Sequence, residues 1–399
     1  KRQLLNIWRN WGYDMERYSS YKDSGVPWIG EIPDDWRIEK AKYLINISNG
    51  SDPKTEGDTP VYGSGASSFR TCGESKEGPA VLVGRKGTLH IPHWITGRYW
   101  NVDTAFDVKV KTNSIILKYY YYLSTCFDYK FYISQTTLPS MRQADYENML
   151  IPVPDRSEQE AIVAYLDKVS NSVEAAIEEL DHAIARLDEY RQSLINEAVT
   201  KGLNPNVPMK DSGVPWIGEI PSDWRIEKAK YLVDIRNGVD PRTEGGTPVY
   251  GSGASSFRTC GETKEGPTVL LGRLGATLHI PHWIVGKYWN MNTAFDVQSK
   301  EITFILKYYY YLATCFDYRF YVSQNTLPIM GKTDYENMLI PVPPQSEQER
   351  IVTYLNAKSS KIDVSIEELG HAIKQLRDYR QSLINEAVTG KIKVPGVEG

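Results

Sequence analysis

Two histidine pairs are the side chains of this sequence best suited to bind a metal ion. His90 and His93 are separated by two residues, and the same spacing returns at His279 and His282. A zinc site needs three or four converging ligands, usually with a further Cys, His or acidic residue at short spacing. Neither pair has such a partner, and LHIPHW is typical of a strand that enters a proline turn. We therefore predict no metal site.

Two glycine-containing phrases are similar to nucleotide-binding loops but lack required residues. The tripeptide GKT begins at Gly331, but a phosphate-binding loop needs a glycine five positions earlier, where Thr326 stands. The phrase YGSGAS, which begins at Tyr62 and Tyr250, lacks the last glycine of the dinucleotide-binding fingerprint. No Asn-Pro-Pro-aromatic tetrapeptide, the usual sign of an amino-methyltransferase centre, is present. We therefore predict no catalytic residue and no cofactor in this chain.

These phrases occur twice because most of the chain is a duplication. Residues 22–44 read KDSGVPWIGEIPDDWRIEKAKYL, and residues 210–232 repeat them with one difference in 23 positions. The offset of 188 becomes 189 after one inserted residue, Ala276, and then holds to Asn385. A period this long indicates duplicated domains and not a solenoid.

Bulk properties favour a soluble, cytoplasmic protein of two or three domains. The chain has 399 residues, 41% of them hydrophobic, and no apolar run of about 18 residues. The four cysteines lie at equivalent positions of the two copies without CxxC spacing, which predicts reduced core thiols. The net charge of −4 argues mildly against nucleic acid, but residues 155–200 alone hold 11 acidic and 4 basic groups. The rest of each copy is balanced, so the net charge does not exclude a local basic groove.

Each copy divides into a lobe and a long helix at a proline-rich step. IPVP at 151–154 and 340–343 precedes Ser-x-x-Glu, a helix-start signal in which the serine can cap an amide. Apolar residues then recur every three or four positions, the seam of a coiled coil, from Leu166 through Tyr190 to Leu194, and from Leu355 to Leu383 with polar breaks at Lys358 and Ser365. Glycines 202 and 390 are predicted to end the two helices. The predicted segments are an N-terminal extension at 1–21, lobes at 22–154 and 210–343, and helices at 155–202 and 344–390.

The lobes are predicted to be rich in β-structure, which makes the fold class α+β. Stretches such as PAVLVGRKGTLHIPHWI mix β-branched and aromatic residues with glycine. The run SIILKYYYYLSTCFDYKFY favours a helix packed on the sheet, with its tyrosines in the core. DYENML predicts a short helix opened by Asp145 or Asp334. Residues 1–14 have no counterpart in the second copy and are either a leader extension or an ordered local segment.

Four isoleucines lie beside the helical seam and widen its apolar stripe: Ile177, Ile184, Ile366 and Ile373. They either pack a helix against its own lobe or accept further helices from a partner protein.

In this order of lobe, helix, lobe and helix, three repeated phrases carry a family resemblance. KDSGVPWIGEIPDDW, IPVP-x2-SEQE and RQSLINEAVT resemble the specificity subunits of type I restriction-modification systems, from Met15 to Lys393. The resemblance implies two target recognition domains for a bipartite DNA site, separated by antiparallel long helices. It also implies two methyltransferase subunits that use S-adenosylmethionine, and optionally two restriction subunits that use ATP and Mg. The methyltransferase subunits would then contact this chain at the isoleucine stripe.

The duplication also predicts the symmetry of the DNA target. Two like lobes on antiparallel helices are related by an approximate twofold axis, and proteins of that symmetry match inverted half-sites. We therefore predict a palindromic or nearly palindromic bipartite target.

Four polar, glycine-hinged loops of each copy are the candidates for DNA contact, since hydrogen-bonding side chains read base edges while Lys and Arg bind phosphates. Ordinary turn chemistry is the alternative for each residue. The first-copy candidates are Ser67, Ser68, Arg70, Arg85, Lys86, Thr88, Asn101, Asp103, Thr104, Gln135, Thr136 and Arg142. The second-copy candidates are Ser255, Ser256, Arg258, Arg273, Thr277, Asn290, Asn292, Thr293, Gln324, Asn325 and Lys332.

The copies differ inside these loops. Lys86 corresponds to Leu274, Asp103 to Asn292, Thr136 to Asn325, and Arg142 to Gly331. Near symmetry of the target is therefore better supported than perfect symmetry. Two other functions stay open: a module that binds carbohydrate or protein, whose binding would not depend on salt, and a metal-dependent hydrolase, which a chelator would inactivate.

Overall fold

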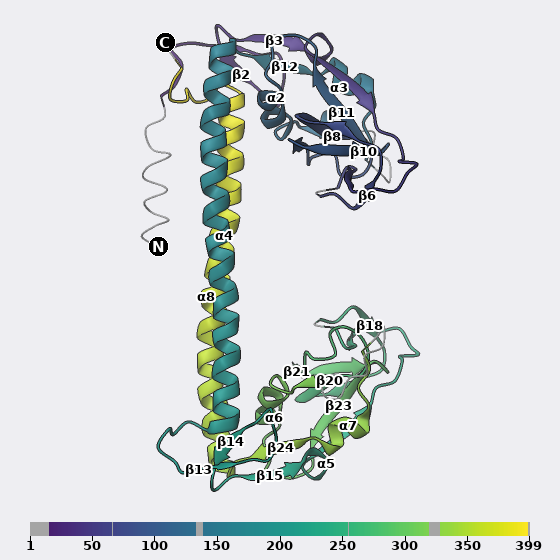
Figure 1. The fold of residues 1–399 in the computed structure, drawn as a ribbon, viewed down its shortest axis with the longest axis vertical. Coiled ribbons are helices and arrows are strands. Elements are labelled where there is room, and N and C mark those ends of the chain that lie inside the picture. Colours follow the sequence, from purple (N-terminus) through teal and green to yellow (C-terminus); the bar gives the residue numbers. More distant parts are fainter. Residues whose placement is uncertain (1–15, 66, 133–138, 254, 319–327, 398–399) are drawn as a thin grey trace. The chain divides into compact units, whose positions relative to one another are not determined.

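The computed structural model describes residues 16–65, 67–132, 139–253, 255–318 and 328–397 (Figure 1). The chain forms two compact units. Unit 1 contains residues 1–179 and 371–399, and unit 2 contains residues 180–370. Each unit therefore consists of one lobe, one half of the first long helix and one half of the second. The predicted extension at residues 1–14 lies outside the described residues.

The lobe of unit 1 is built on two four-stranded sheets. One has the strand order β4-β11-β8-β9 and the other β6-β5-β10-β7, while β1 pairs with β2 and β12 pairs with β3. Strand β8 reads AVLVG and is buried along its whole length, as its apolar run predicts. The strands are β1 Tyr21–Asp23, β2 Glu31–Pro33, β3 Arg37–Lys40, β4 Ile45–Asn49, β5 Thr59–Tyr62, β6 Arg70–Cys72, β7 Lys76–Glu77, β8 Ala80–Gly84, β9 His93–Ile95, β10 Arg98–Asn101, β11 Ala105–Val110 and β12 Leu150–Val153. The short helices are η1 Ala41–Tyr43, α2 Leu117–Ser124, η2 Tyr129–Phe131 and α3 Gln143–Asn148.

The lobe of unit 2 repeats this topology. Its four-stranded sheets have the orders β16-β23-β20-β21 and β18-β17-β22-β19. The predicted pair of similar β-rich lobes is thus confirmed. The strands are β13 Met209–Asp211, β14 Glu219–Pro221, β15 Arg225–Lys228, β16 Val233–Asn237, β17 Thr247–Tyr250, β18 Arg258–Cys260, β19 Lys264–Glu265, β20 Thr268–Gly272, β21 His282–Ile284, β22 Lys287–Asn290, β23 Ala294–Ser299 and β24 Leu339–Val342. The short helices are α5 Ala229–Leu232, α6 Leu306–Ala313 and α7 Lys332–Asn337.

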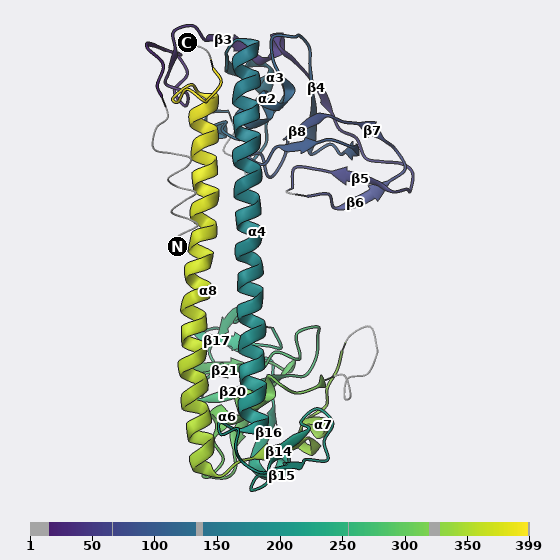
Figure 2. The same ribbon diagram turned by 60° about the vertical axis from the view of Figure 1, so that its left-hand side comes forward.

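Buried tyrosines attach each lobe to the ends of both long helices, α4 Arg156–Lys201 and α8 Gln345–Val388. Tyr119 of α2 donates to the carbonyl of Pro152, just before α4, at 3.2 Å and to that of Val388, at the end of α8, at 3.1 Å. In unit 2, Tyr308 donates likewise to Pro341 and Val199. The start of one helix therefore lies beside the end of the other in each unit. The helices are antiparallel, as predicted (Figure 2).

The helical seam is buried best near the lobes. Leu166, Val169 and Val173 are at most 2% exposed, and Leu355 and Leu376 are as well covered. Ion pairs flank the seam between Arg380 and Glu174 in unit 1, at 2.9 Å, and between Arg191 and Asp363 in unit 2, at 2.6 Å. Tyr190 was expected in the seam, and this prediction is wrong. Its side chain is 51% exposed, because strict heptad spacing drifts around a straight helix of 3.6 residues per turn.

The helix ends agree with the sequence only in part. Gly202 and Gly390 follow α4 and α8 with φ of +76° and +70°, the conformation of a glycine stop. Ser157 was expected to cap the first long helix, but α4 already begins at Arg156. Asp145 was expected to open α3; it lies in the first turn instead, and its carboxylate accepts the backbone N–H of Arg142. Among the described residues, no helix is long and apolar enough to cross a membrane.

Candidate nucleic-acid interface

The four candidate loops of unit 1 come together, which the sequence does not reveal. The Ser64 hydroxyl donates to the carbonyl of Lys86 at 2.6 Å, and the Arg85 amide donates to the carbonyl of Thr104 at 2.7 Å. The fourth loop joins through its described end, since the Gly87 amide donates to the carbonyl of Pro139 at 2.9 Å. We call residues 63–70, 84–88, 101–104 and 139–142 the first loop cluster, apart from residue 66, which is not described.

Unit 2 holds an equivalent second loop cluster at residues 251–258, 272–277, 290–293 and 328–332, of which residue 254 is not described. The Arg273 amide donates to Thr293 at 2.8 Å, and the Gly275 amide donates to Pro328 at 3.0 Å. The Thr277 hydroxyl donates to the carbonyl of Ser252 at 2.8 Å. Four predicted candidates, Gln135, Thr136, Gln324 and Asn325, lie outside the described residues.

The cations of the first loop cluster are mostly paired with carboxylates. Arg70 contacts Asp52 at 3.2 Å and lies over the ring of Phe69, with 5.4 Å from its guanidinium carbon to the ring centroid. Lys86 Nζ lies 3.3 Å from Asp103 Oδ2, and both side chains are nearly half exposed, at 43% and 48%. Such exposed pairs stabilise a fold little, which leaves the side chains available to a ligand.

Arg258 and Arg273 of the second loop cluster form no ion pair with a carboxylate within the described parts of the chain, whereas Lys332 does. Arg258 lies over the ring of Phe257 at 5.6 Å, and its guanidinium donates to Met291 Sδ. Arg273 donates to the carbonyl of Asn292 at 3.3 Å. The counterpart of Asp52 is Asp240, which accepts from the Asn292 amide at 3.2 Å.

Other candidates differ in how far they reach the surface. Ser67 and Ser68 are exposed, as are Ser255 and Ser256, while Thr88 is half-buried. Thr104 has a structural contact, because its hydroxyl accepts the Ser64 amide at 3.3 Å. In the second copy Thr293 packs against Gly251, where an added Cβ would lie 2.8 Å from the threonine oxygen.

Arg142 and Lys332 occupy different positions on their short helices. The Arg142 side chain is 84% exposed and contacts Asp145 at 2.8 Å. Hydrogen bonding by this guanidinium lowers the pKa of the Asp145 carboxyl. Lys332 pairs with Glu336 at 3.4 Å, while the position equivalent to Arg142 is Gly331.

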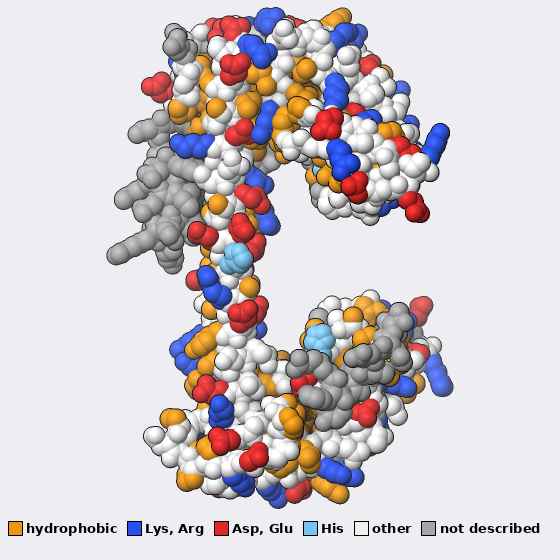
Figure 3. All heavy atoms as spheres, in the orientation of Figure 1, with side chains coloured by type: hydrophobic (Ala, Val, Ile, Leu, Met, Phe, Trp, Pro, Cys, Tyr) orange, Lys and Arg blue, Asp and Glu red, His pale blue; other side chains and the backbone are white. Residues whose placement is uncertain are grey.

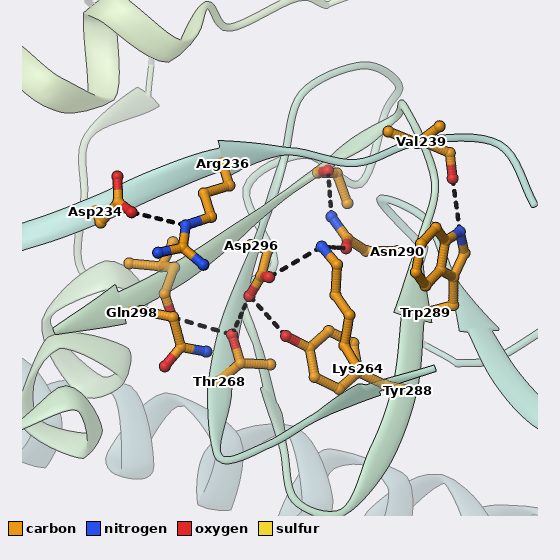
Figure 4. A network of polar contacts seen from close by, with 12 residues as sticks. Asp234, Arg236, Val239, Lys264, Thr268, Tyr288, Trp289, Asn290, Asp296 and Gln298 are labelled. Carbon is orange, nitrogen blue, oxygen red and sulfur yellow. Dashed lines mark hydrogen bonds and ion pairs between the residues drawn. The ribbon is translucent and has the colours of Figure 1, made fainter. Parts of the chain in front are cut away.

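Asn101 and Asn290, predicted as base-reading residues, are fully buried inside the lobes. The Asn290 amide donates to the carbonyl of Ala294 at 3.0 Å, and its oxygen accepts Lys264 Nζ at 2.7 Å (Figure 4). In unit 1 the Asn101 amide and oxygen make the same two contacts, with Ala105 and Lys76. These asparagines are therefore the buried members of the two loop clusters and make internal contacts.

Sequence reasoning missed the buried ion pair that these asparagines support. Lys76 Nζ lies 3.0 Å from Asp107 Oδ2, and Lys264 Nζ lies 3.0 Å from Asp296 Oδ2. A tyrosine hydroxyl, from Tyr99 in unit 1, also donates to the carboxylate at 2.9 Å. Burial and the nearby carboxylate raise the pKa of this tyrosine. The sequence signal that could have identified this network is the retention of KEGP, YWN and AFDV in both copies, since these phrases contain its lysine, tyrosine, asparagine and aspartate.

The surface charge of the first lobe is mixed. Figure 3 shows basic and acidic side chains interspersed on the visible face of this lobe, without a wide patch of one sign. DNA binding by this lobe would therefore depend on local groups such as the loop cluster.

The candidate partner-binding isoleucines are not equally accessible. Ile177 and Ile373 are buried, at 4% and 6% exposure, and Ile184 and Ile366 are half-buried. Only the latter two therefore retain appreciable surface for a further helix.

The histidine pairs lie at strand β9 and its counterpart β21. His90 and His279 are exposed, whereas His93 and His282 are half-buried, and burial lowers the pKa of both half-buried imidazoles. No group of three or more His, Cys, Asp or Glu side chains suited to a metal occurs in the described residues.

The known proteins that this chain is similar to share one description, that of type I restriction specificity proteins. A family model described as the type I restriction modification DNA specificity domain matches residues 33–182. The chain is 24% identical to the type I restriction enzyme MjaVIII specificity subunit of Methanocaldococcus jannaschii over 348 residues, which cover 79% of this chain and 76% of that protein. It is 21% identical to the EcoDI specificity subunit of Escherichia coli, with 91% and 90% covered.

A solved structure shares the fold. A chain from a study of complex assembly and conformational transition of the type I R-M system superposes with a TM-score of 0.64 and 16% identity. The match covers 90% of this chain and 98% of that chain. At this identity the likeness supports the arrangement of lobes and long helices alone.

Proposed function

This chain belongs to the family of type I restriction-modification specificity subunits, and from that premise we propose that its two lobes read two nearly identical, inverted half-sites of one DNA target. DNA target recognition without catalysis is the function of the family. The observation that carries the proposal is the duplication of the loop cluster on the same hydrogen-bonded scaffold in both lobes. Equal scaffolds that present nearly equal side chains favour nearly equal base sequences.

The helices support an inverted order of the half-sites. Unit 1 combines the start of α4 with the end of α8, and unit 2 combines the end of α4 with the start of α8. In the order of elements along the chain, exchanging α4 with α8 therefore exchanges the contents of the two units. Twofold proteins bind inverted half-sites because each half meets the same surface.

The proposed complex contains other subunits that perform the chemistry. The chain functions with methyltransferase and restriction subunits, and we propose two of each. The methyltransferase would bind S-adenosylmethionine and methylate adenine, and the restriction subunit would use ATP and Mg in the cytoplasm. On this chain, the half-buried Ile184 and Ile366 are the members of the isoleucine stripe that can still contact a methyltransferase.

Methylation mapping tests the target. The chain is expressed together with its methyltransferase subunit in a host without adenine methylation, and methylated adenines are located by single-molecule sequencing. We expect one bipartite motif whose halves are inverted copies, or nearly so, around an unread spacer. Two unrelated half-sites would refute the inverted-repeat proposal.

A binding measurement separates DNA recognition from the carbohydrate or protein alternative. The affinity of the complex for the mapped target should fall steeply as salt rises, because Lys and Arg release counterions from phosphates. Salt-independent binding of a ligand other than DNA would favour the alternative.

A further inference from the structure

Two neighbouring residues of the loop cluster change together between the lobes. In unit 1, Lys86 and Asp103 form an ion pair at 3.3 Å. The equivalent residues of unit 2 are Leu274 and Asn292, which cannot form one. A donor and an acceptor have thus been replaced by an apolar group and an amide.

The backbone that carries these residues is the same in both lobes. The Arg85 amide donates to Thr104 at 2.7 Å, and the Arg273 amide donates to Thr293 at 2.8 Å. The Arg85 guanidinium holds the carbonyl of residue 103 at 3.2 Å, and that of Arg273 holds the carbonyl of residue 292 at 3.3 Å. The lobes therefore present different side chains from one scaffold, although the loop of unit 2 is longer by Ala276.

The exchange is not explained by charge or by stability. It replaces one positive and one negative charge with two neutral groups, so the attraction of each lobe to phosphates is unchanged. The Lys86–Asp103 pair is nearly half exposed, and exposed ion pairs contribute little to folding. The side chains differ chiefly in the hydrogen bonds that they offer a ligand.

The pair in unit 1 matches a G·C base pair. In the major groove guanine presents two acceptors, N7 and O6, and cytosine presents one donor, N4. Lys86 supplies N–H donors for guanine, and the adjacent Asp103 supplies an acceptor for cytosine. Donor and acceptor lie side by side, as the two edges of one base pair do.

The pair in unit 2 matches an A·T base pair. One N–H of the exposed Asn292 amide is held by Asp240 at 3.2 Å, which orients the group. Its second N–H and its oxygen then suit adenine N7 and N6. The half-buried Leu274 supplies an apolar surface for the thymine methyl group.

We propose that Lys86 and Asp103 read a G·C pair in the half-site of the first lobe, and that Leu274 and Asn292 read an A·T pair at the equivalent position of the other half-site. The target is then an imperfect palindrome that departs from symmetry at this position. The inference rests on the proposed DNA-reading function and adds to it the residues and the bases.

Paired variants in the full chain, expressed with its methyltransferase subunit, test the assignment. Lys86→Leu with Asp103→Asn should change the methylated motif from G·C to A·T in one half-site only, with a preference shift of roughly tenfold or more. Leu274→Lys with Asn292→Asp should make the opposite change in the other half-site. A second version of each variant inserts or removes the alanine at position 276, so that loop length is matched.

The outcomes separate this inference from the proposed function. A wild-type motif with the same base pair at this position in both halves would overturn the inference while DNA reading stands, and so would double variants that fold with an unchanged motif. Thermal unfolding identifies a variant that fails to fold, in which case the reciprocal variant decides. If the wild-type complex methylates no motif and binds no DNA, the proposed function itself fails.

Discussion

The two lobes differ at one side chain, Ala80 or Thr268, beside a buried network whose charged and polar residues are retained. The tyrosine of this network donates to Asp107 Oδ2 in unit 1 and to Asp296 Oδ1 in unit 2. In unit 2, Asp296 Oδ1 accepts from both Thr268 and Tyr288, and Oδ2 accepts from Lys264. In unit 1 the position of Thr268 is Ala80, and Asp107 Oδ1 is buried without a hydrogen-bond partner. The same fold therefore tolerates a buried carboxylate oxygen that is satisfied in one copy and unsatisfied in the other.

The surface of the lobes diverged in a different way from the core. In the core the Lys, Asp, Asn and Tyr of the network are retained and one neighbour changed. In the loop clusters the backbone hydrogen bonds are retained, while the side chains at positions 86 and 103 were both exchanged. A retained backbone that carries exchangeable loop side chains allows one fold to read different DNA sequences.

Breaking the ion pair between Lys264 and Asp296 should have the largest effect on the stability of unit 2. Lys264→Met leaves the Asp296 carboxylate, which is only 4% exposed, without its cation. Unpairing a buried charge costs about 3 kcal/mol, which should lower the melting temperature of the transition that includes this lobe by roughly 6–12 °C. Calorimetry of the full chain measures this change in melting temperature. The control is Lys287→Met on the exposed neighbouring position of β22, which should change little. Equal effects of both variants would contradict a role for the pair.

Exchanging the residues at positions 80 and 268 should have a smaller effect on stability, of opposite sign in the two lobes. Thr268→Ala removes one donor to Asp296 and should cost about 1–2 kcal/mol, whereas Ala80→Thr gives Asp107 Oδ1 a partner and should add up to about 1 kcal/mol. Denaturant unfolding of the two variants and of the double exchange checks both signs. Destabilisation by Ala80→Thr would mean that the extra atoms cannot be accommodated beside Asp107.

The sequence predicted the elements of the lobes better than it predicted the residues of the site. Repetition and apolar patterning identified the lobes, the long helices and the loops that carry polar side chains. They could not distinguish Asn101, which is buried at the end of β10, from Asp103, which is half exposed, because the two polar residues lie only two positions apart in the same NVDT phrase. Asn101 is buried because it contacts Lys76, which is distant in the sequence. No local sequence pattern encodes such a contact.

The long helices show a similar limit. Heptad spacing predicted Leu166 and Val173 in the contact, and both are buried. It also predicted Tyr190, which is exposed. The phrases IPDDW and SEQE were recognised separately, but the hydrogen bond of 3.0 Å from Trp36 Nε1 to Glu158 that joins them required the structure.

The equivalent lysines of helices α2 and α6 provide the smallest and most selective test. Lys118 of unit 1 pairs with Asp167 at 2.9 Å, but the equivalent residue in unit 2 is Asn356. Lys307 therefore has no carboxylate there and lies over the ring of Trp283, 4.4 Å from its centroid. Burial lowers the pKa of Lys307 to about 8.

This shift predicts a difference in chemical reactivity. At pH 8 about half of the Lys307 amines should be neutral and nucleophilic, against well under a hundredth for a lysine of ordinary pKa near 10.4. Since the folded state then binds this proton less tightly than the unfolded chain, the free energy of unfolding should rise with pH between about 8 and 10. Asn356→Asp restores the carboxylate and should reduce both effects. Mass spectrometry after brief acetylation at pH 8 measures Lys307 with Lys118 as the internal control, and equal labelling of the two would show that the missing carboxylate has no influence on the amine.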